Sequence, residues 1–309
     1  VETLAELEHG TIKKFICCNG GEINDVTTPN SITNLKTGLS NSRFQTSSMN
    51  GNLLLFNGSD TPQVYNGSTL ADSTISGSGL TPSTLTGCNV HKNRLYAWDT
   101  DSTSFWYGAT NAIQGTLTEF DLSGVAAYGG NLTLMATWNH DGGAGVDDYA
   151  LFLMSGGTAF LYEGSDPGDA SNWSLIGIYK IGEPASVRSA CKVGGDIAIM
   201  TKQDFVFFSE VFKNGGAVTS QTKLSGAAIN SINSYESNYG WEVQLYPKAS
   251  TGGWLFFNVP VSTNTVYHQY GINTITGAAF QFINMNARTW GIYNNNLYFG
   301  ESGSIMKAD

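Results

Sequence analysis

Three aspartates around a glycine-rich bend are the densest group of metal-binding residue types in the chain. The segment from His140 to Asp148 reads His-Asp-Gly-Gly-Ala-Gly-Val-Asp-Asp. Carboxylate and carbonyl oxygens are the ligands that Ca²⁺ prefers, although this spacing is not that of an EF-hand loop. The alternative is a tight turn that enters a strand at Tyr149. We favour the turn, assign no metal-binding residue, and leave calcium binding by the Asp141–Asp148 loop open.

A second group of polar residues, from Ser165 to Trp173, resembles the Asp-box turn of sialidase propellers. It occurs once, and its spacing from aspartate to glycine differs from that turn by one residue. Turn chemistry alone explains an Asp-Pro-Gly sequence before a strand. A sialidase also needs several arginines around the carboxylate of its substrate. This chain has only four arginines, at positions 43, 94, 188 and 288.

Motifs of the common enzyme classes are missing from the sequence. It contains no GxSxG elbow, no HExxH, no GxxxxGK[ST] loop and no strand-linked GxGxxG. The four histidines are scattered, and we interpret His91 and His268 as structural residues of strands. A carboxylate pair for glycoside hydrolysis depends on separation in space, which a sequence does not give. We therefore predict no enzyme activity, no catalytic or cofactor-binding residue, and no cofactor.

The net charge and the cysteine pattern restrict the possible functions of the protein further. The formal net charge is −10, with 15 lysines and arginines in 309 residues, and the adjacent pair Lys13-Lys14 is interpreted as a solvated strand edge. Gripping phosphates requires clustered basic residues, whereas an acidic surface lets DNA pass without binding. Cys17, Cys18, Cys88 and Cys191 form no CxxC motif and are predicted to be buried free thiols, which suits a reducing cytosol. No apolar run is long enough to span a membrane.

The elements that would position these residues are short strand-turn-strand units, which recur seven times. Each unit has an apolar and aromatic strand, a turn rich in Asn and Gly, and a second strand. The first strands of the units contain Phe15, Leu54, Leu95, Phe152, Ile199, Phe256 and Tyr298. Their spacing of roughly 39 to 57 residues is typical of propeller blades, with two intervals long enough to hold an insertion.

These repeats predict an all-β protein, a β-propeller of six to eight blades with seven favoured. We expect a single domain over residues 1–309, with loop insertions near 124–148 and 213–239. At most one short helix is expected, over Leu224–Tyr235, and Thr69–Thr86 is interpreted as a surface loop between blades. The chain starts at Val1 and ends without a polar tail, so we expect it to be part of a longer polypeptide.

Several segments resemble a family of virion structural proteins from short-tailed bacteriophages and related prophages. The segments that carry the resemblance are Asn89–Tyr96 with Phe105–Tyr107, Glu119–Leu122 with Gly129–Leu132, Ala136–Trp138 with Asp141–Asp148, Tyr162–Pro167 with Trp173–Gly177, Lys192–Asp196, and His268–Tyr270 with Asn273–Ala278 and Leu297–Gly300. The likeness is most specific in the middle third of the chain. It implies a tail nozzle or hub protein, a ring of six copies around the DNA exit channel, without catalytic residues.

The expected function is therefore that of a structural subunit of a phage tail, located in the virion and assembled in the host cytoplasm. Its expected partners are copies of itself in a ring, for which the resemblance implies a hexamer, an adaptor or head–tail connector, tail fibres or spikes, a tail plug or needle, and viral DNA that passes through without sequence-specific binding. We also expect a neutral to acidic inner wall, with the Asp141–Asp148 and Thr69–Thr86 loops near subunit or partner contacts.

The alternative function is that of a carbohydrate-binding or carbohydrate-active propeller, sialidase-like or lectin-like, with tryptophans as sugar-stacking platforms. The tryptophans are Trp98, Trp106, Trp138, Trp173, Trp241, Trp254 and Trp290, and the competing interpretation places them in the blade cores.

Overall fold

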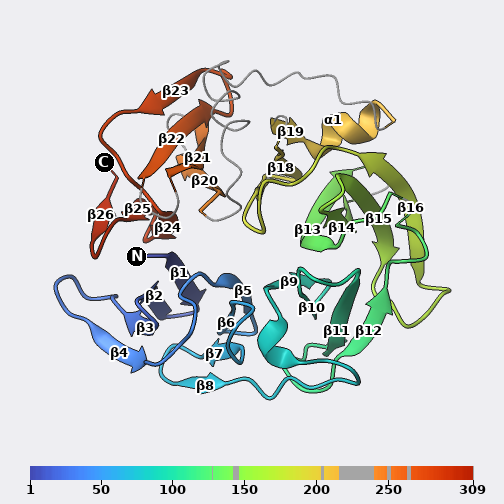
Figure 1. Ribbon diagram of the computed structural model, residues 1–309, viewed down its shortest axis with the longest axis horizontal. Helices are drawn as coiled ribbons and strands as arrows, with labels where there is room; N and C mark the ends of the chain where they lie inside the picture. Colours follow the sequence, from blue (N-terminus) through green and yellow to red (C-terminus); the bar gives the residue numbers. More distant parts are fainter. Residues whose placement is uncertain are drawn as a thin grey trace. The chain divides into compact units, whose positions relative to one another are not determined.

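The molecule is built from seven antiparallel sheets, each a meander whose strands follow one another in the sequence (Figure 1). The computed structural model describes residues 1–126, 128–141, 146–202, 205–215, 240–248, 252–262 and 266–308. In this part of the chain, five sheets have four strands and two have three. The seven sheets are the blades of a seven-bladed β-propeller, numbered here in chain order.

The first four blades each contain four strands. Blade 1 consists of β1 (Thr3–His9), β2 (Ile12–Asn19), β3 (Glu22–Asp25) and β4 (Thr33–Lys36). Blade 2 consists of β5 (Gln45–Met49), β6 (Asn52–Phe56), β7 (Gln63–Tyr65) and β8 (Leu70–Asp72). Blade 3 consists of β9 (Gly87–His91), β10 (Arg94–Trp98), β11 (Ser104–Thr110) and β12 (Thr118–Asp121). Blade 4 consists of β13 (Leu132–Asp141), β14 (Val146–Met154), β15 (Thr158–Gly164) and β16 (Trp173–Lys180).

The last three blades differ in strand number. Blade 5 consists of β17 (Ala190–Val193), β18 (Asp196–Met200) and β19 (Phe205–Phe207), followed at once by the helix α1 (Phe208–Lys213). Blade 6 consists of β20 (Glu242–Lys248), β21 (Gly252–Ser262), β22 (Val266–Asn273) and β23 (Ala279–Phe282). Blade 7 consists of β24 (Thr289–Tyr293), β25 (Asn296–Gly300) and β26 (Ile305–Lys307). A 3-10 turn, η1 (Pro82–Thr84), precedes blade 3, and no described helix is long and apolar enough to cross a membrane.

The residues group into two compact units, which are treated separately below. Unit 1 comprises Val1–Ala127, Ser165–Asp169 and Thr289–Asp309, and so holds blades 1, 2, 3 and 7. Unit 2 comprises Tyr128–Gly164 and Ala170–Arg288, and holds the strands of blades 4, 5 and 6. The loop between β15 and β16 thus packs with unit 1, although its flanking strands belong to unit 2.

The second strand of a blade is apolar almost throughout, because both of its faces are covered. In β10 all five residues are buried, and in β6 the four residues after Asn52 are buried. A strand covered on both faces needs a continuous apolar run and not an alternating pattern. The outer strands are the opposite, since β8 and β12 have no buried residue. This contrast explains why the apolar runs in the sequence mark the blades so clearly.

Tight turns join the strands at the positions where the sequence has Asn and Gly. Asn50 and Gly51 between β5 and β6 have φ values of 50° and 74°, and Asn294 and Asn295 between β24 and β25 have 48° and 61°. Two successive residues with positive φ are the signature of a type I′ hairpin turn, which suits the twist of the strands it joins. Asn and Gly tolerate this conformation better than other residues.

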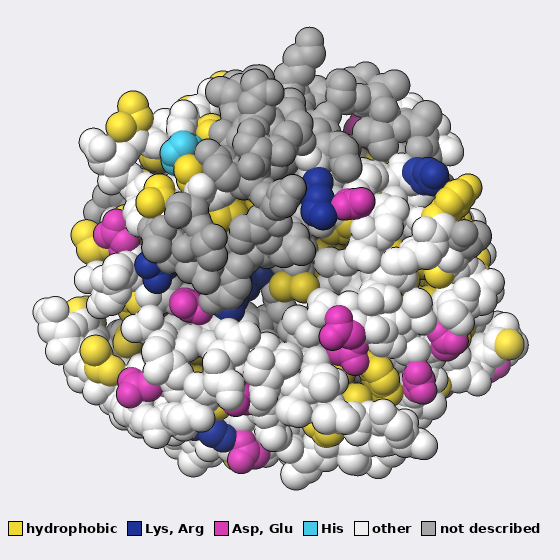
Figure 2. Space-filling model, in the orientation of Figure 1, with side chains coloured by type: hydrophobic (Ala, Val, Ile, Leu, Met, Phe, Trp, Pro, Cys, Tyr) yellow, Lys and Arg dark blue, Asp and Glu magenta, His cyan; other side chains and the backbone are white. Residues whose placement is uncertain are grey.

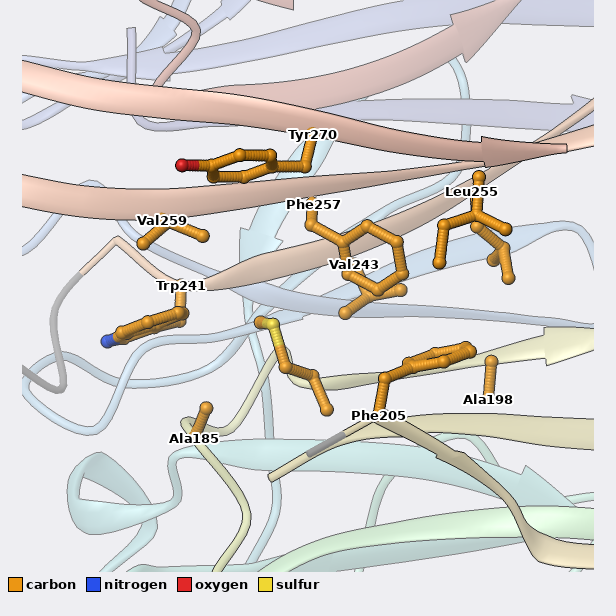
Figure 3. Packing of buried hydrophobic residues seen from close by; sticks show 11 residues of the cluster. Ala185, Ala198, Phe205, Trp241, Val243, Leu255, Phe257, Val259 and Tyr270 are labelled. Carbon is orange, nitrogen blue, oxygen red and sulfur yellow. The ribbon is translucent and has the colours of Figure 1, made fainter. Parts of the chain in front are cut away.

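Apolar clusters fill the spaces between neighbouring blades within each unit. In unit 2, residues of blades 5 and 6 meet in one cluster, where Phe205 of β19 faces Phe257 of β21 (Figure 3). Their ring centroids are 5.0 Å apart in an edge-to-face arrangement. In unit 1, β24 lies against β1 so closely that a Cβ on Gly291 would come within 2.6 Å of Leu4 Cβ. Only glycine permits this approach of the two blades.

The predicted fold class is confirmed, including the preferred number of blades. Each of the seven units found in the sequence is the second and third strand of one blade, from β2 and β3 to β25 and β26. Two details differ. The described part of 124–148 is mostly the β13–β14 hairpin of blade 4, because β13 is a long first strand and not an insertion. Thr69–Thr86 begins with the outer strand β8, and two of its residues, Ile75 and Leu85, are buried.

Within the described residues there is one α-helix, at a position where the sequence predicted none. It covers Phe208–Lys213, and the predicted helix at Leu224–Tyr235 and most of the predicted insertion 213–239 lie outside the described residues. Aromatic packing explains why a helix forms at α1. Phe208 and Phe212, four residues apart on one face of α1, both contact Trp138 of β13. This contact depends on a residue 70 positions away in the sequence, so the local pattern did not reveal it.

Candidate functional site

Asp147 and Asp148 of the predicted Asp141–Asp148 loop do not converge. Asp147 and Asp148 belong to β14, where they pair with His140 and Asn139 of β13. Successive residues of a strand point to opposite faces, so these two carboxylates cannot hold one ion together. The Asp148 carboxylate accepts a hydrogen bond from Asn139 Nδ2. The described part is a hairpin, and residues 142–145 at its tip lie outside the described chain.

The Asp-box-like segment is held by an arginine. Asp166 accepts a hydrogen bond from the backbone N–H of Gly168 at 3.0 Å, and its carboxylate is 3.2 Å from the guanidinium of Arg94. Arg94 Nη1 donates to Gly108 O at 2.7 Å, and Nε donates to Ser165 O at 3.1 Å. The guanidinium also lies over the Tyr107 ring, 5.6 Å from its centroid. We call these five residues, Arg94, Tyr107, Gly108, Ser165 and Asp166, the Arg94 cluster.

The Arg94 cluster has a structural role in unit 1, because it links strands β10 and β11 to the loop between β15 and β16. Arg94 is buried, and its donors are bonded to protein oxygens from strand β11 and from the loop between β15 and β16. A guanidinium bonded in this way has little capacity left for a substrate carboxylate. Arg188 is likewise committed, since its Nη1 is 2.7 Å from Glu242 Oε2 and both side chains are buried. Two of the four arginines in this chain are therefore occupied by groups of the protein itself.

The tryptophans are core residues, with one exception. Six of the seven are buried, and Trp254, the remaining one, packs its ring edge-to-face with Phe280 at 5.0 Å. Trp173 stacks on Tyr162 at 5.1 Å, and Trp138 Nε1 donates a hydrogen bond to Asp196. Side chains used in this way do not present a face to a sugar. The interpretation of the tryptophans as blade core is confirmed.

The cysteines and the lysine pair also behave as structural residues. All four cysteines are free, and Cys17, Cys18 and Cys88 are buried while Cys191 is half-buried. Burial raises the pKa of the Cys17 thiol to about 11 and that of Cys191 to about 12, so both are protonated at neutral pH. Lys13 and Lys14 are paired with Glu8 and Asp25. They are therefore not a phosphate-binding pair.

Histidines and carboxylates are not gathered into a metal centre in the described residues. No group of three or more His, Cys, Asp or Glu side chains there is placed to hold a metal ion. His91 is buried in β9, and His268 lies in β22 with its ring 6.4 Å from that of Tyr270. His91 belongs to unit 1 and His268 to unit 2. These positions agree with the structural role predicted for both residues.

A cavity that the sequence did not reveal lies in unit 1, between blades 1 and 7. Its volume is about 610 Å³. We call it the blade 1–7 pocket and define it by six of its lining residues, which are Phe15, Asn19, Glu22, Asn24, Tyr293 and Tyr298. The first four come from one face of β2 and β3, and the two tyrosines come from β24 and β25. More than 250 residues separate these two groups in the sequence, so no local motif predicts the pocket.

One wall of the pocket is aromatic. The ring of Phe15 stacks on Tyr293 with centroids 5.0 Å apart and lies 5.2 Å from Tyr298 in a tilted arrangement. Behind this wall, Val1 and Leu4 close the apolar cluster between the two blades. The aromatic side chains are thus fixed by packing on one side and reach the cavity on the other.

The part of the pocket toward the β2–β3 hairpin forms its polar wall, whose side chains are hydrogen-bonded to one another. Asn24 Nδ2 donates to Glu22 Oε2 at 3.3 Å, and Asn34 Nδ2 donates to Asn24 Oδ1 at 3.0 Å. Asn19 pairs directly with Glu22 across the β2–β3 hairpin. This row places amide and carboxylate groups at one end of the cavity, in an orientation set by the strand register.

Comparisons with known proteins identify the fold. No family model matches the sequence, and no curated protein matches it. Among solved structures, the chain is similar to the WD40 β-propeller domain of Doa1, with a TM-score of 0.58, 11% identity, and coverage of 99% of this chain and 91% of that one. It is also similar to BBS1N in complex with ARL6DN, with a TM-score of 0.55, 10% identity, and coverage of 96% and 86%.

A third similar structure is YCF48 bound to D1 peptide, with a TM-score of 0.51, 8% identity, and coverage of 96% of this chain and 87% of that one. At such low identity the likeness concerns the fold alone. The chain is a seven-bladed β-propeller.

Proposed function

We propose that this chain is a structural subunit of a bacteriophage tail, in the nozzle or hub ring that surrounds the DNA exit channel and joins the adaptor to fibres or spikes. The observation that carries the proposal is the Arg94 cluster. Arg94 belongs to the first segment of the resemblance to phage virion proteins, and Asp166 belongs to the fourth. Two segments of that resemblance thus bond to each other and stabilise the scaffold.

The distribution of charge supports a role without tight binding of nucleic acid. The net charge is −10. On the face shown in Figure 2, the described lysines and arginines are scattered among acidic and neutral side chains and do not form a basic patch. Phosphates near such a surface stay hydrated, whereas a basic wall would hold DNA through counterion release. This is the behaviour that a channel for an ejected genome requires.

Assembly into a ring requires head-to-tail contacts, so each subunit needs two different complementary surfaces. We place these contacts on the loops of the blades, since loops on a rigid scaffold are where binding residues concentrate. The candidates are the Asp141–Asp148 hairpin and Thr69–Thr86. An adaptor, fibres or spikes, and a plug or needle complete the list of proposed partners, and the proposed location is the virion.

The test is the composition of purified phage particles that encode this chain. We expect mass spectrometry to detect the chain in intact virions, in about six copies per particle, with the portal protein as the internal standard. Mass photometry of detergent-released tails should then find it in a ring-sized complex. Absence of the chain from purified particles would overturn the proposal, as would a copy number matching the major capsid protein.

The hydrolase form of the alternative function receives less support than a binding role. Two of the four arginines of the chain, Arg94 and Arg188, are already engaged in ion pairs with carboxylates of the protein. Six of the seven tryptophans are buried and are not available to stack on a sugar. A lectin-like role rests on a different feature, the blade 1–7 pocket. That feature carries an inference of its own.

A further inference from the structure

The polar groups of the blade 1–7 pocket differ from those of the Arg94 cluster, because they line a cavity. We propose that this pocket binds a neutral saccharide. The proposal does not depend on the assignment to a phage tail. It rests on four properties of the pocket: charge, aromatic wall, register and rigidity.

The charge of the pocket selects against anions. Glu22 is the only charged side chain among its described lining residues, and neither lysine nor arginine lines it. A phosphate or a carboxylated sugar would meet the Glu22 carboxylate without a lysine or arginine side chain to offset the repulsion. A neutral ligand with hydroxyl groups meets no such cost. Each hydroxyl can donate to the carboxylate or accept from an amide N–H.

The aromatic wall suits the apolar face of a sugar ring. Tyr293 and Tyr298 line the cavity together with Phe15, whose ring stacks on Tyr293 at 5.0 Å. Aromatic rings contribute a large apolar area with little loss of conformational freedom, and a tyrosine adds a hydroxyl at its tip. A pyranose presents C–H groups on its faces and hydroxyls around its edge. It therefore needs a flat apolar surface beside a row of polar groups.

The strand register supplies that combination on one surface. Phe15, Cys17 and Asn19 alternate along β2 and so share one face, as do Glu22 and Asn24 on β3. Cys17 pairs with Asn24, and Asn19 pairs with Glu22. The same face thus runs from an aromatic end at Phe15 to a polar end at the hairpin. A ligand with an apolar face and a polar edge matches this gradient.

The rim of the pocket is held by hydrogen bonds before any ligand binds. The backbone N–H of Phe15 donates to Thr27 Oγ1 at 2.9 Å, and the Val26 N–H donates to Phe15 O at 2.9 Å. The Ser31 N–H donates to Thr28 O at 3.1 Å, which closes the loop between β3 and β4. A site fixed in advance loses less conformational entropy on binding. The volume of about 610 Å³ is within the usual range for small-molecule sites and accommodates one or two sugar rings.

The experiment is saturation-transfer NMR on the full chain with five probes: N-acetylglucosamine, galactose, chitobiose, lactose and maltose. We expect at least one neutral probe to bind with a Kd in the millimolar range or tighter. N-acetylneuraminic acid and N-acetyl-lysine methylamide are the anionic and cationic comparisons. Titration of the best probe then gives its Kd for the wild-type chain and for the variants Glu22→Gln, Asn24→Ala and Tyr298→Phe.

Glu22→Gln and Asn24→Ala are expected to weaken binding at least tenfold, since each removes a hydrogen-bonding group of the polar wall. Tyr298→Phe keeps the ring and should weaken binding less. The matched control is Glu119→Gln on the outer strand β12, which should leave the Kd unchanged. Circular dichroism confirms that each variant is folded. Three results would overturn the proposal: no neutral probe binds, the charged probes bind equally well, or Glu22→Gln and Asn24→Ala both keep the wild-type Kd.

Discussion

The Arg94 cluster and the blade 1–7 pocket lie in the same unit, and both contain tyrosine and a carboxylate, yet their polar groups have different surroundings. In the Arg94 cluster, the guanidinium and the Asp166 carboxylate bond to the protein itself. In the pocket, Glu22 and Asn24 bond to each other and line a cavity. The comparison teaches that composition alone does not separate a structural cluster from a binding site. What separates them is whether space remains next to the polar groups.

The strongest way to break this comparison is to remove Arg94. Arg94→Ala should lower the free energy of unfolding by about 3 kcal/mol, because it leaves buried carbonyl oxygens without donors and Asp166 without its cation. Urea denaturation followed by tryptophan fluorescence measures the change. The control is Lys13→Ala, which removes an exposed ion pair and should leave the free energy of unfolding nearly unchanged. Equal losses in the free energy of unfolding for the two variants would show that the Arg94 cluster does not stabilise the fold.

The thiol of Cys17, which lines the pocket, offers a pH-dependent probe. Its pKa is raised to about 11 by burial, so the reactive thiolate becomes more abundant as the pH rises toward that value. The rate of alkylation by iodoacetamide should increase about tenfold per pH unit between pH 8 and pH 10. Peptide mass spectrometry follows the rate at Cys17, with fully buried Cys18 as the internal control. A rate that levels off near pH 8 would contradict the raised pKa.

A smaller effect is expected when the Asp166 charge is removed and its shape is kept. Asp166→Asn can still accept the Gly168 N–H but no longer attracts Arg94 as an ion, so the loss should be about 1 kcal/mol. The same urea experiment measures it. Because Asp166 is 40% exposed, solvent offsets part of the lost attraction. A loss as large as that of Arg94→Ala would mean that the ion pair, and not the carbonyl bonds, dominates the cluster.

The smallest effect on stability is expected in the pocket. Glu22 is exposed, so Glu22→Gln should change the free energy of unfolding by no more than about 0.5 kcal/mol. The same variant should weaken saccharide binding, which separates a binding residue from a structural one. A large loss of stability would place Glu22 in the same class as Arg94.

The sequence predicted the blades because their signal is local. The apolar second strands and the Asn and Gly turns lie within about ten residues of each other, as at Leu54 and Asn57-Gly58. The helix α1 and the pocket were missed because each depends on contacts across long stretches of chain. Phe212 is stabilised by Trp138, and Tyr298 by Phe15, and neither pairing leaves a trace in the local pattern. The Asp166 turn was predicted, but its arginine partner was not.

The central claim, that this propeller is a ring subunit of a phage tail, is tested most directly by a cryo-electron microscopy reconstruction of particles that encode it. At residue-level density, we predict a ring of copies of this chain around the tail axis, with few lysines and arginines facing the channel. The Asp141–Asp148 hairpin or Thr69–Thr86 should lie at contacts with a neighbouring copy or a partner. Density for the chain away from the tail axis would contradict the account, as would a channel wall lined with its lysines and arginines.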